Sequence, residues 1–556
     1  MRALVQKLDQ RLSEASDVRS LLLLFLLFWI VAVAVYFRAS NAELIDDGFA
    51  GLMKFKDMGW AAFPQSFGFT SLYYVHDLVV LGVYYIVGKS SLGWFWVMIT
   101  LHCLNAVLAY IVFRKFYAVF NINFGALIAF CGGVLFLLSP YQTENVVWAA
   151  TLHYSVALTI FFTGCWLVLR MVSTGTIAVT DTVLLLVLFI VSLLTLEISL
   201  IFPFAWSCLL LPAVLSGKTT LKIRDILTQV MLPLLMSIGL YFIMTKLIKG
   251  HWIPHYGATH LQNNSLQNYS SSVARYILKL LGFVHFTEYD KREFIYGLCA
   301  HWKIALTIQL GAVAVLYFLL RKFKTNDVAA VFVSLICLAL LLLFPSLQMY
   351  FMFLFTPEND RLSYFFSIAV YQLIPFLFFQ LSAYAGLAVV MVYLLPGLYF
   401  LNKQVIKWHE AGVLHQRCVQ SFTWTEAPHV YILNAPANYN GAYAFRNNER
   451  LPYALNFFKD YKQPERIHQV LSSAYSSLQD STLVTVVNDS TLRVQLVTNG
   501  GWLMNEFYGA VDYTSEEFNV DVDEWSPSYT VTFHRKYPEA VYLYSSGTGF
   551  YKLQGF

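Results

Sequence analysis

The chain has 556 residues, of which 58% are hydrophobic and 13% are charged, and its mean hydropathy is +0.57. This composition argues against a soluble globular protein and is typical of a chain that crosses a membrane many times. The formal net charge of +4 is small, and no basic cluster is interleaved with aromatic residues, which argues against nucleic-acid binding. The seven cysteines lie in or beside apolar runs without C-x-x-C spacing, so they indicate core residues rather than disulfides or a zinc site.

A polar N-terminus, residues 1–19, precedes eleven apolar runs that are long enough to cross a hydrocarbon core of about 30 Å. No small-residue cleavage site follows the first run, so we expect a retained anchor rather than a signal peptide. Lys and Arg are concentrated before the first run and at alternate connections, which predicts a cytoplasmic N-terminus and an outer C-terminal region. The runs lie near residues 20–37, 92–113, 123–139, 149–170, 182–198, 199–215, 226–247, 302–320, 327–345, 364–382 and 384–401.

Two adjacent carboxylates, Asp46 and Asp47, follow the first span on the predicted outer side. A lone acid in such a loop more often caps a helix or stays solvated. Neighbouring like charges hinder each other's ionisation, and partial burial near lipid raises the pKa of a carboxyl group. A carboxylate with a raised pKa can act as a base near neutral pH, so the pair is a candidate catalytic group.

Residues 71–88 are apolar enough for a span, but they contain His76 and Asp77 and would invert the basic loops that follow. We therefore expect a helix at the outer interface, where tyrosine side chains are favoured, with an ordinary span as the alternative. Three long polar loops, 38–91, 249–301 and 346–363, lie on the same predicted face and define an outer chamber.

Five further residues, most of them ionisable, stand out by their positions in or beside the apolar runs. The stretch 139–148 places Glu144 and Trp148 one helical turn apart, where a helix cap and an interfacial Trp are the simpler reading. His153, inside the next span, is expected to face a cavity, and Glu197 is expected where two half-spans meet. Arg361, at the outer mouth of the tenth span, runs against the charge bias and indicates an anionic partner such as a phosphate.

After residue 401 the long apolar runs end, and alternating segments predict strands. We expect a small extracytoplasmic α+β domain over 402–556, which either holds an acceptor or acts as a lid. The segment 487–492 predicts a hairpin turn, and 467–478 predicts a helix. The predicted strands are 429–433, 483–487, 492–497, 529–534 and 541–544.

Five features recur in order over residues 20–401 and carry a resemblance to a known superfamily. They are the pair Asp46-Asp47, the helix Thr100 to Tyr110 with His102, the Pro140 to Trp148 loop, Glu197 before Pro203, and Asp360-Arg361-x-x-Tyr364. Together they resemble the integral-membrane glycosyltransferases of the GT-C superfamily, nearest to the protein O-mannosyltransferase-like and TMTC-like branch. The resemblance implies a GT-C-like transmembrane catalytic domain of about eleven helices over residues 20–401.

The resemblance also implies an activity: transfer of a sugar from a polyprenyl-phosphate-linked donor in the membrane lipid to a glycan, lipid or protein acceptor. In such enzymes an acid of the first loop deprotonates the acceptor hydroxyl, which makes Asp46 the first candidate for the base and Asp47 the second. Direct displacement would invert the anomeric centre. Arg361, with His153 or Lys246, would bind the donor phosphate. Supporting roles would fall to Glu144, Trp148, Glu197, His102, Asp360 and Tyr364.

The residues leave other functions open. A polytopic lipid or glycan transporter is one alternative, although the sequence shows no internal repeat. A membrane-bound acyl or phosphoglycol transferase of the cell envelope is another, which should present a His or Thr rather than an acid pair. We expect no cofactor, although His251, His255 and His260 raise the alternative of a divalent metal. The localisation we expect is a bacterial inner membrane, with the active site on the periplasmic side.

Overall fold

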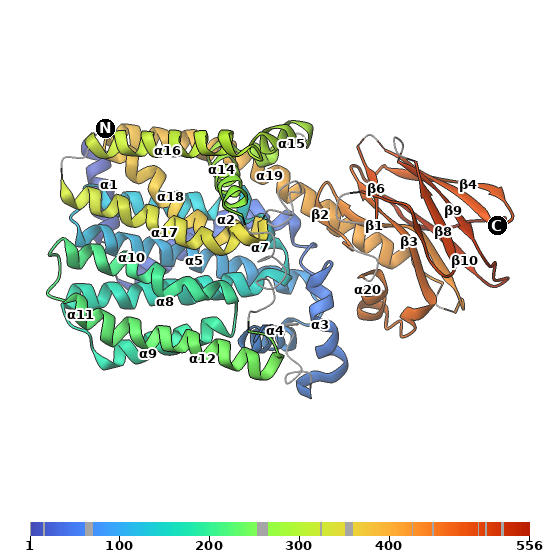
Figure 1. Cartoon of the computed structure of the whole chain (residues 1–556), viewed down its shortest axis with the longest axis horizontal. Coiled ribbons are helices and arrows are strands. Elements are labelled where there is room, and N and C mark those ends of the chain that lie inside the picture. The colour runs from blue at the N-terminus through green and yellow to red at the C-terminus, as the bar shows by residue number, and fades with distance from the viewer. Residues whose placement is uncertain are drawn as a thin grey trace.

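A computed structural model shows a bundle of long helices with a sheet domain beyond one end of it (Figure 1). Helix α1 (Arg2–Glu14) lies at the other end of the bundle. The first loop and the sheet domain therefore share one end of the bundle. The structure describes residues 2–14, 17–61, 71–252, 265–287, 289–322, 325–350, 360–424, 426–446, 450–498, 500–505, 509–523 and 527–556.

The helical part contains α-helices joined by short 3-10 and π turns. The helices are α1, α2 (Val18–Tyr36), α3 (Asp47–Met58), α4 (Tyr74–Val87), α5 (Ser91–Val119), α6 (Gly125–Leu137), α7 (Thr143–Val147), α8 (Leu152–Thr174), α9 (Val179–Leu193), α10 (Phe202–Leu215), α11 (Ile223–Ile226), α12 (Leu232–Lys249), α14 (Leu266–Gly282), α15 (Tyr289–Leu298), α16 (Trp302–Lys322), α17 (Asn326–Tyr350), α18 (Tyr364–Phe379) and α19 (Ala383–Ser421). The short turns are η1 (Phe37–Ala39), η3 (Pro140–Gln142), η4 (Ala149–Thr151), η5 (Glu197–Ile201), η6 (Leu227–Met231), η8 (Val284–Phe286) and η9 (Asp360–Ser363).

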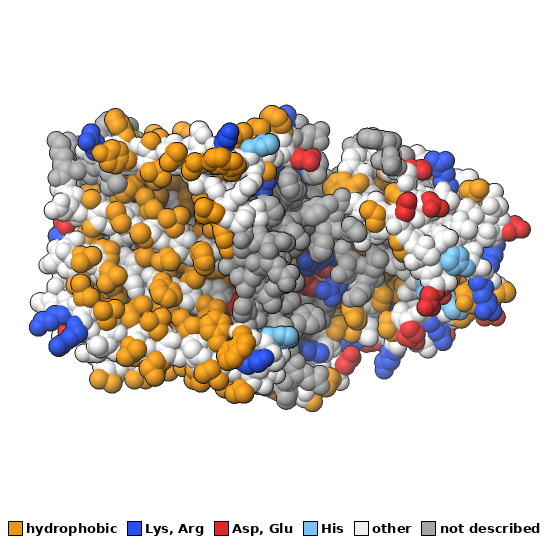
Figure 2. Space-filling model, viewed as in Figure 1, with side chains coloured by type: hydrophobic (Ala, Val, Ile, Leu, Met, Phe, Trp, Pro, Cys, Tyr) orange, Lys and Arg blue, Asp and Glu red, His pale blue; other side chains and the backbone are white. Residues whose placement is uncertain are grey.

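The sequence predicts eleven spans, and the described structure has fewer helices that are long enough to cross a membrane. In the described part of the chain, 8 helices are long and apolar enough to cross a membrane, or up to 10 if each of two bent pairs is one span. Each predicted run contains a helix, but α9 has only 15 residues. Hydrophobic side chains are spread over the visible face of the helical part, whereas the sheet domain displays more charge (Figure 2). The expected multi-pass helical membrane domain is confirmed.

Helix α4 spans only 14 residues, fewer than the roughly 20 that a crossing needs. Its placement at the outer interface stays a prediction.

Glycines let the central helices of the bundle approach closely. A Cβ atom on Gly132 of α6 would lie 2.2 Å from the Gln372 amide of α18, and one on Gly164 of α8 would lie 2.3 Å from Trp206 of α10. The Gln372 amide donates to the Ala129 carbonyl at 3.3 Å. Small residues allow this kind of contact inside membrane bundles, where apolar burial alone does not draw helices together.

The sheet domain follows α19, which continues through the boundary predicted at residue 401. One sheet has the order β11-β10-β1-β3-β6 with β2 on β1, and the other has the order β4-β5-β9-β8-β7. Its only long helix among the described residues is α20 (Arg450–Lys459). The strands are β1 (Val430–Tyr439), β2 (Ala442–Tyr443), β3 (Ile467–Tyr475), β4 (Ser481–Asn488), β5 (Thr491–Val497), β6 (Trp502–Met504), β7 (Tyr513–Thr514), β8 (Phe518–Val522), β9 (Ser528–Phe533), β10 (Val541–Ser546) and β11 (Gly549–Lys552).

The predicted α+β class of this domain is confirmed, and so is the hairpin, which joins the antiparallel strands β4 and β5. The helix predicted for 467–478 is wrong, because this segment forms β3. Strand β3 lies between β1 and β6, and its last six residues are all buried. A strand that is covered on both faces lacks polar alternation, so its pattern does not separate strand from helix.

Candidate functional site

A cavity of about 520 Å³ lies at the end of the helical bundle that faces the sheet domain. Its wall combines residues of the first loop, α4, the start of α8, the segment before α18 and the sheet domain. The lining residues are Asp47, Gly48, Gly51, Leu52, Phe55, Tyr73, His76, Asp77, Val80, Trp94, Trp148, Ala149, Ala150, Thr151, His153, Tyr154, Arg361, Arg446 and Arg450.

The loop that carries the acid pair is fixed by backbone contacts. Asp46 has a φ of 45°, a conformation that residues other than glycine rarely adopt. A Cβ atom on Gly48 would lie 2.5 Å from the Glu43 carbonyl oxygen, so this tight turn needs a glycine. The Trp148 indole donates to the Ile45 carbonyl at 3.0 Å. The turn therefore holds Asp46 and Asp47 in a defined position against the segment that precedes α8.

The two aspartates face different surroundings. Asp47 lines the cavity, and its carboxylate accepts from Arg446 Nη1 at 2.9 Å and from Arg450 Nη2 at 2.5 Å. Asp46 is fully buried, and neither of its carboxylate oxygens has a hydrogen-bond partner among the described residues. The same arginines approach Asp46 at 3.9 Å, from Arg446 Nη1, and 3.4 Å, from Arg450 Nε. The pair therefore shares two cations unequally.

These surroundings raise the pKa of Asp46, which suits a general base. Burial and the Asp47 charge raise the pKa of Asp46 to about 7, against the opposing effect of Arg446 and Arg450. Burial also raises the pKa of the nearby Glu43 carboxyl group, which is fully buried. Asp46 therefore changes its charge near neutral pH.

Arg361 brings a third guanidinium to the cavity. Its Nη1 lies 2.5 Å from Glu144 Oε1, and its backbone N–H donates to Glu144 Oε2 at 2.8 Å. The guanidinium also lies 5.4 Å from the centre of the Trp148 ring. The expectation of one shared helical face for Glu144 and Trp148 is wrong, because α7 ends at Val147 and Trp148 is extended. Both residues nevertheless meet at Arg361.

Histidine and carboxylate side chains form another part of the cavity wall. His153 lines the cavity, and its ring centre lies 4.9 Å from that of His76. Asp77 pairs with Lys54 at 3.0 Å. Glu197 accepts hydrogen bonds from Tyr73, a lining residue, and from Ser71 at 3.4 Å. Glu197 thus holds the wall rather than facing the space itself.

The other predicted site residues lie away from the cavity. His102 contacts the Tyr364 hydroxyl at 3.1 Å, and both are buried in the bundle. Asp360 is buried and pairs with Lys279 at 2.6 Å and with His285 at 3.2 Å. Lys246 donates to the Gly250 carbonyl at the end of α12. None of these four side chains, His102, Tyr364, Asp360 and Lys246, is among the lining residues of the cavity.

The sequence did not point to Arg446 and Arg450, which lie about 400 positions after the acid pair. Arg450 is the first residue of α20 and Arg446 precedes this helix, and two arginines in a domain rich in polar residues gave no local signal of a site. Of the three histidines in the second loop, His251 is described, whereas His255 and His260 lie outside the described residues. Among the described residues, one group with metal-binding spacing is found, His429, His468 and Glu517, and it belongs to the sheet domain.

Comparisons with known proteins add little to this geometry. No family model matches the chain. No curated protein matches it either. Among solved structures, the chain is similar to the crystal structure of ArnT from Cupriavidus metallidurans in the apo state, with 13% sequence identity and a TM-score of 0.33. The alignment covers 83% of this chain and 95% of that chain. A likeness at this TM-score carries no argument about function, so the function must be argued from the cavity.

Proposed function

We propose that the protein transfers a sugar from a polyprenyl-phosphate-linked donor to an acceptor hydroxyl group within this cavity. One observation carries the proposal: an acid pair and three arginines, Arg361, Arg446 and Arg450, meet at one end of a membrane bundle. Transfer from such a donor needs a base for the acceptor hydroxyl and cations for the departing phosphate. The arginines and Asp47 line the cavity, and Asp46, the neighbour of Asp47, is buried beside its wall.

The arginines suit the phosphate of the donor. A guanidinium presents a planar set of donors that matches phosphate oxygens in pairs. Arg446 and Arg450 now bind the Asp47 carboxylate, so a donor phosphate would take over some of these hydrogen bonds. His153, which also lines the cavity, would support the phosphate, whereas Lys246 has no part in the proposal because it does not line the cavity.

Asp46 is the proposed base, because it combines a pKa of about 7 with a carboxylate that no hydrogen bond engages among the described residues. Asp47 binds Arg446 and Arg450 at the cavity wall. When these arginines bind the donor phosphate instead, the acceptor would gain access to Asp46. The acceptor hydroxyl would give its proton to Asp46, and its oxygen would form the new bond to the anomeric carbon. The bond from that carbon to the phosphate oxygen would break, leaving polyprenyl phosphate and an inverted sugar.

The wall also suits a sugar ring and an acceptor. Aromatic side chains of Trp94, Trp148 and Tyr154 line the cavity, and sites of this kind combine apolar faces with a few polar groups. The basic residues at the other loops support a site on the outer side of the membrane. We further propose a bacterial inner membrane with the site on its periplasmic side, in keeping with a sequence that predicts no disulfide framework. The acceptor would be a glycan, a lipid or a protein of the cell envelope.

The test is sugar transfer from a labelled polyprenyl-phosphate sugar by the full-length protein in detergent. Asp46→Asn should lower the rate by about 10²- to 10⁴-fold, the usual contribution of a general base. Asp57→Asn is the matched control, since Asp57 is an exposed acid of the same helix, α3, and should leave the rate unchanged. A normal rate in the Asp46→Asn protein would overturn the proposed mechanism.

A further inference from the structure

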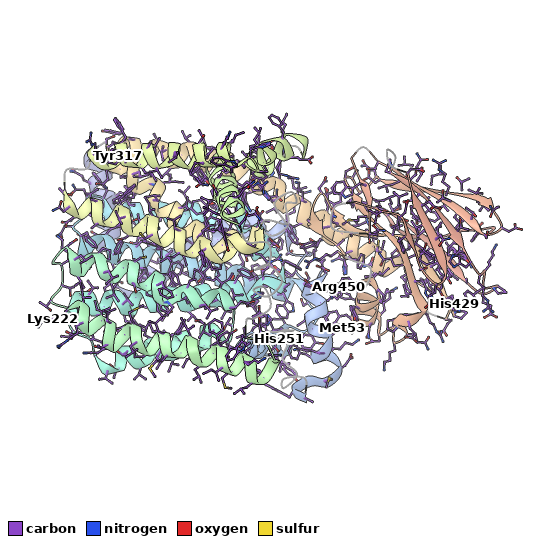
Figure 3. The ribbon with its side chains drawn as sticks, viewed as in Figure 1. Met53, Lys222, His251, Tyr317, His429 and Arg450 are labelled. Carbon is purple, nitrogen blue, oxygen red and sulfur yellow. The ribbon has the colours of Figure 1, made fainter. Side chains whose placement is uncertain are left out.

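Three side chains with metal-binding chemistry meet in the sheet domain, away from the cavity. We propose that His429, His468 and Glu517 bind one zinc ion, which joins the two sheets of this domain. One ligand atom of each residue lies within 4.8 Å of those of the other two. Figure 3 shows His429 well separated from Arg450, which lines the cavity. The inference is therefore independent of the proposed transfer reaction.

The sheet topology brings the three residues together from distant parts of the chain. His429 directly precedes β1, and its carbonyl accepts from the Val541 N–H at the start of β10. His468 is the second residue of β3, which pairs in parallel with β1. Glu517 directly precedes β8, a strand of the other sheet. A metal at this point would therefore tie one sheet to the other.

The distances suit a small ion after a modest adjustment. The His468 ring lies between the other two residues, with its Nε2 3.4 Å from His429 Nδ1 and its Nδ1 2.9 Å from Glu517 Oε2. A zinc ion would take one of these two nitrogens, and the three ligand atoms, which lie within 4.8 Å of one another, would have to move closer together. Bond lengths of about 2.0–2.2 Å in a tetrahedral zinc site separate ligand atoms by roughly 3.3 Å. The side chains of His468 and Glu517 are 23% and 26% exposed, so their torsions can bring the set together.

The surroundings contain further polar atoms that point to a ligand. Tyr431 and Tyr542 are buried, and neither hydroxyl has a hydrogen-bond partner among the described residues. The Glu517 carboxylate lies near both of these tyrosines. Stranded hydroxyl groups beside a carboxylate suit the outer shell of a metal, where they hydrogen-bond to a liganding carboxylate or to a bound water.

Aromatic stacking holds the two imidazoles in place. Tyr537 stacks on His429 with ring centres 4.0 Å apart, and Tyr431 stacks on His468 at 4.9 Å. Two imidazoles and one carboxylate form a ligand set that zinc accepts, with a fourth position left for water.

The test is zinc binding by the purified full-length protein in detergent, after treatment with a chelator and removal of the chelator. Zinc chloride is added, free metal is removed, and bound zinc is counted by mass spectrometry of the elements. We expect one zinc per chain and a higher melting temperature with zinc than without it, because a ligand that binds the native state stabilises it. His468→Gln and Glu517→Gln should each lower the affinity at least tenfold.

His534→Gln is the matched control, because His534 is an exposed histidine of the same domain, near the Glu516 carbonyl. It should keep one zinc per chain. The melting curves without zinc show whether each variant is folded, so a loss of binding is separated from a loss of structure. Equal zinc contents and equal melting shifts in wild type and His468→Gln would overturn the inference and leave the three residues as a hydrogen-bonded group.

Discussion

Two groups of paired charges lie at the same end of the bundle, and one of them lines the cavity described above. In the first, Asp47, Arg446 and Arg450 are 22–29% exposed and line the space. In the second, Lys279 and Asp360 are 0% and 4% exposed and pair at 2.6 Å. The first group can exchange its partners for a substrate, whereas the second is closed off. Exposure to the cavity thus distinguishes Asp47, Arg446 and Arg450 from the closed pair, although Asp46, beside Asp47, is itself fully buried.

The contrast is sharpest between neighbours in the sequence. Asp360 and Arg361 are adjacent, yet Asp360 turns to Lys279 and His285, whereas Arg361 lines the cavity and pairs with Glu144. Lys279 belongs to α14 and His285 to η8, so the Asp360 side chain fixes these two elements to the start of α18. Sequence proximity to a site residue therefore does not give a residue a role in the site.

The largest effect on stability should come from the closed group. Asp360→Ala leaves the Lys279 charge buried without its carboxylate, and breaking a buried pair in this way costs about 3–5 kcal/mol. Thermal unfolding in detergent should show a clearly lower melting temperature, whereas Asp57→Ala, at an exposed position of α3, should change it little. A normal melting temperature combined with lost sugar transfer would instead place Asp360 in the active site and break the comparison.

Much of the fold could be predicted from the sequence, because each element has a local signal. Apolar runs long enough to cross a membrane predicted the helices of the bundle, and period-2 alternation predicted five strands of the sheet domain. The covered strand β3 has no such alternation, so it was predicted as a helix. The end of helix α19 could not be predicted either, since the helix continues beyond the last apolar run to Ser421.

The candidate site could be predicted only in part. Asp46, Asp47, His153 and Arg361 are unusual where they stand, since charged or ionisable groups near lipid are costly, and this cost is visible in one sequence. Arg446 and Arg450 stand in a domain rich in polar residues, where an arginine is ordinary. Only the tertiary structure, which docks the start of α20 on the first loop, brings them to the acid pair.

Substitution of Arg446 or Arg450, which line the cavity, should weaken donor binding and, unlike Asp360→Ala, leave the melting temperature nearly unchanged. Arg450→Gln and Arg446→Gln each remove one guanidinium from the cavity, and a hydrogen bond to a charged group is worth about 1.5–3 kcal/mol. We expect donor binding to weaken by roughly 10- to 150-fold with a nearly normal melting temperature, measured as the concentration dependence of transfer. Arg493→Gln, which removes an exposed arginine of β5, is the control. Unchanged donor dependence would contradict a phosphate role for these arginines.

The most direct test of the account is the pH dependence of sugar transfer by the wild type and by Asp47→Asn. A base must be deprotonated to accept a proton, so the rate should rise with pH through the Asp46 pKa of about 7 and level off above it. The Asp47 charge helps to raise that pKa, so Asp47→Asn should move the rising limb to lower pH. A limb that stays in place in Asp47→Asn would contradict Asp46 as the base coupled to Asp47.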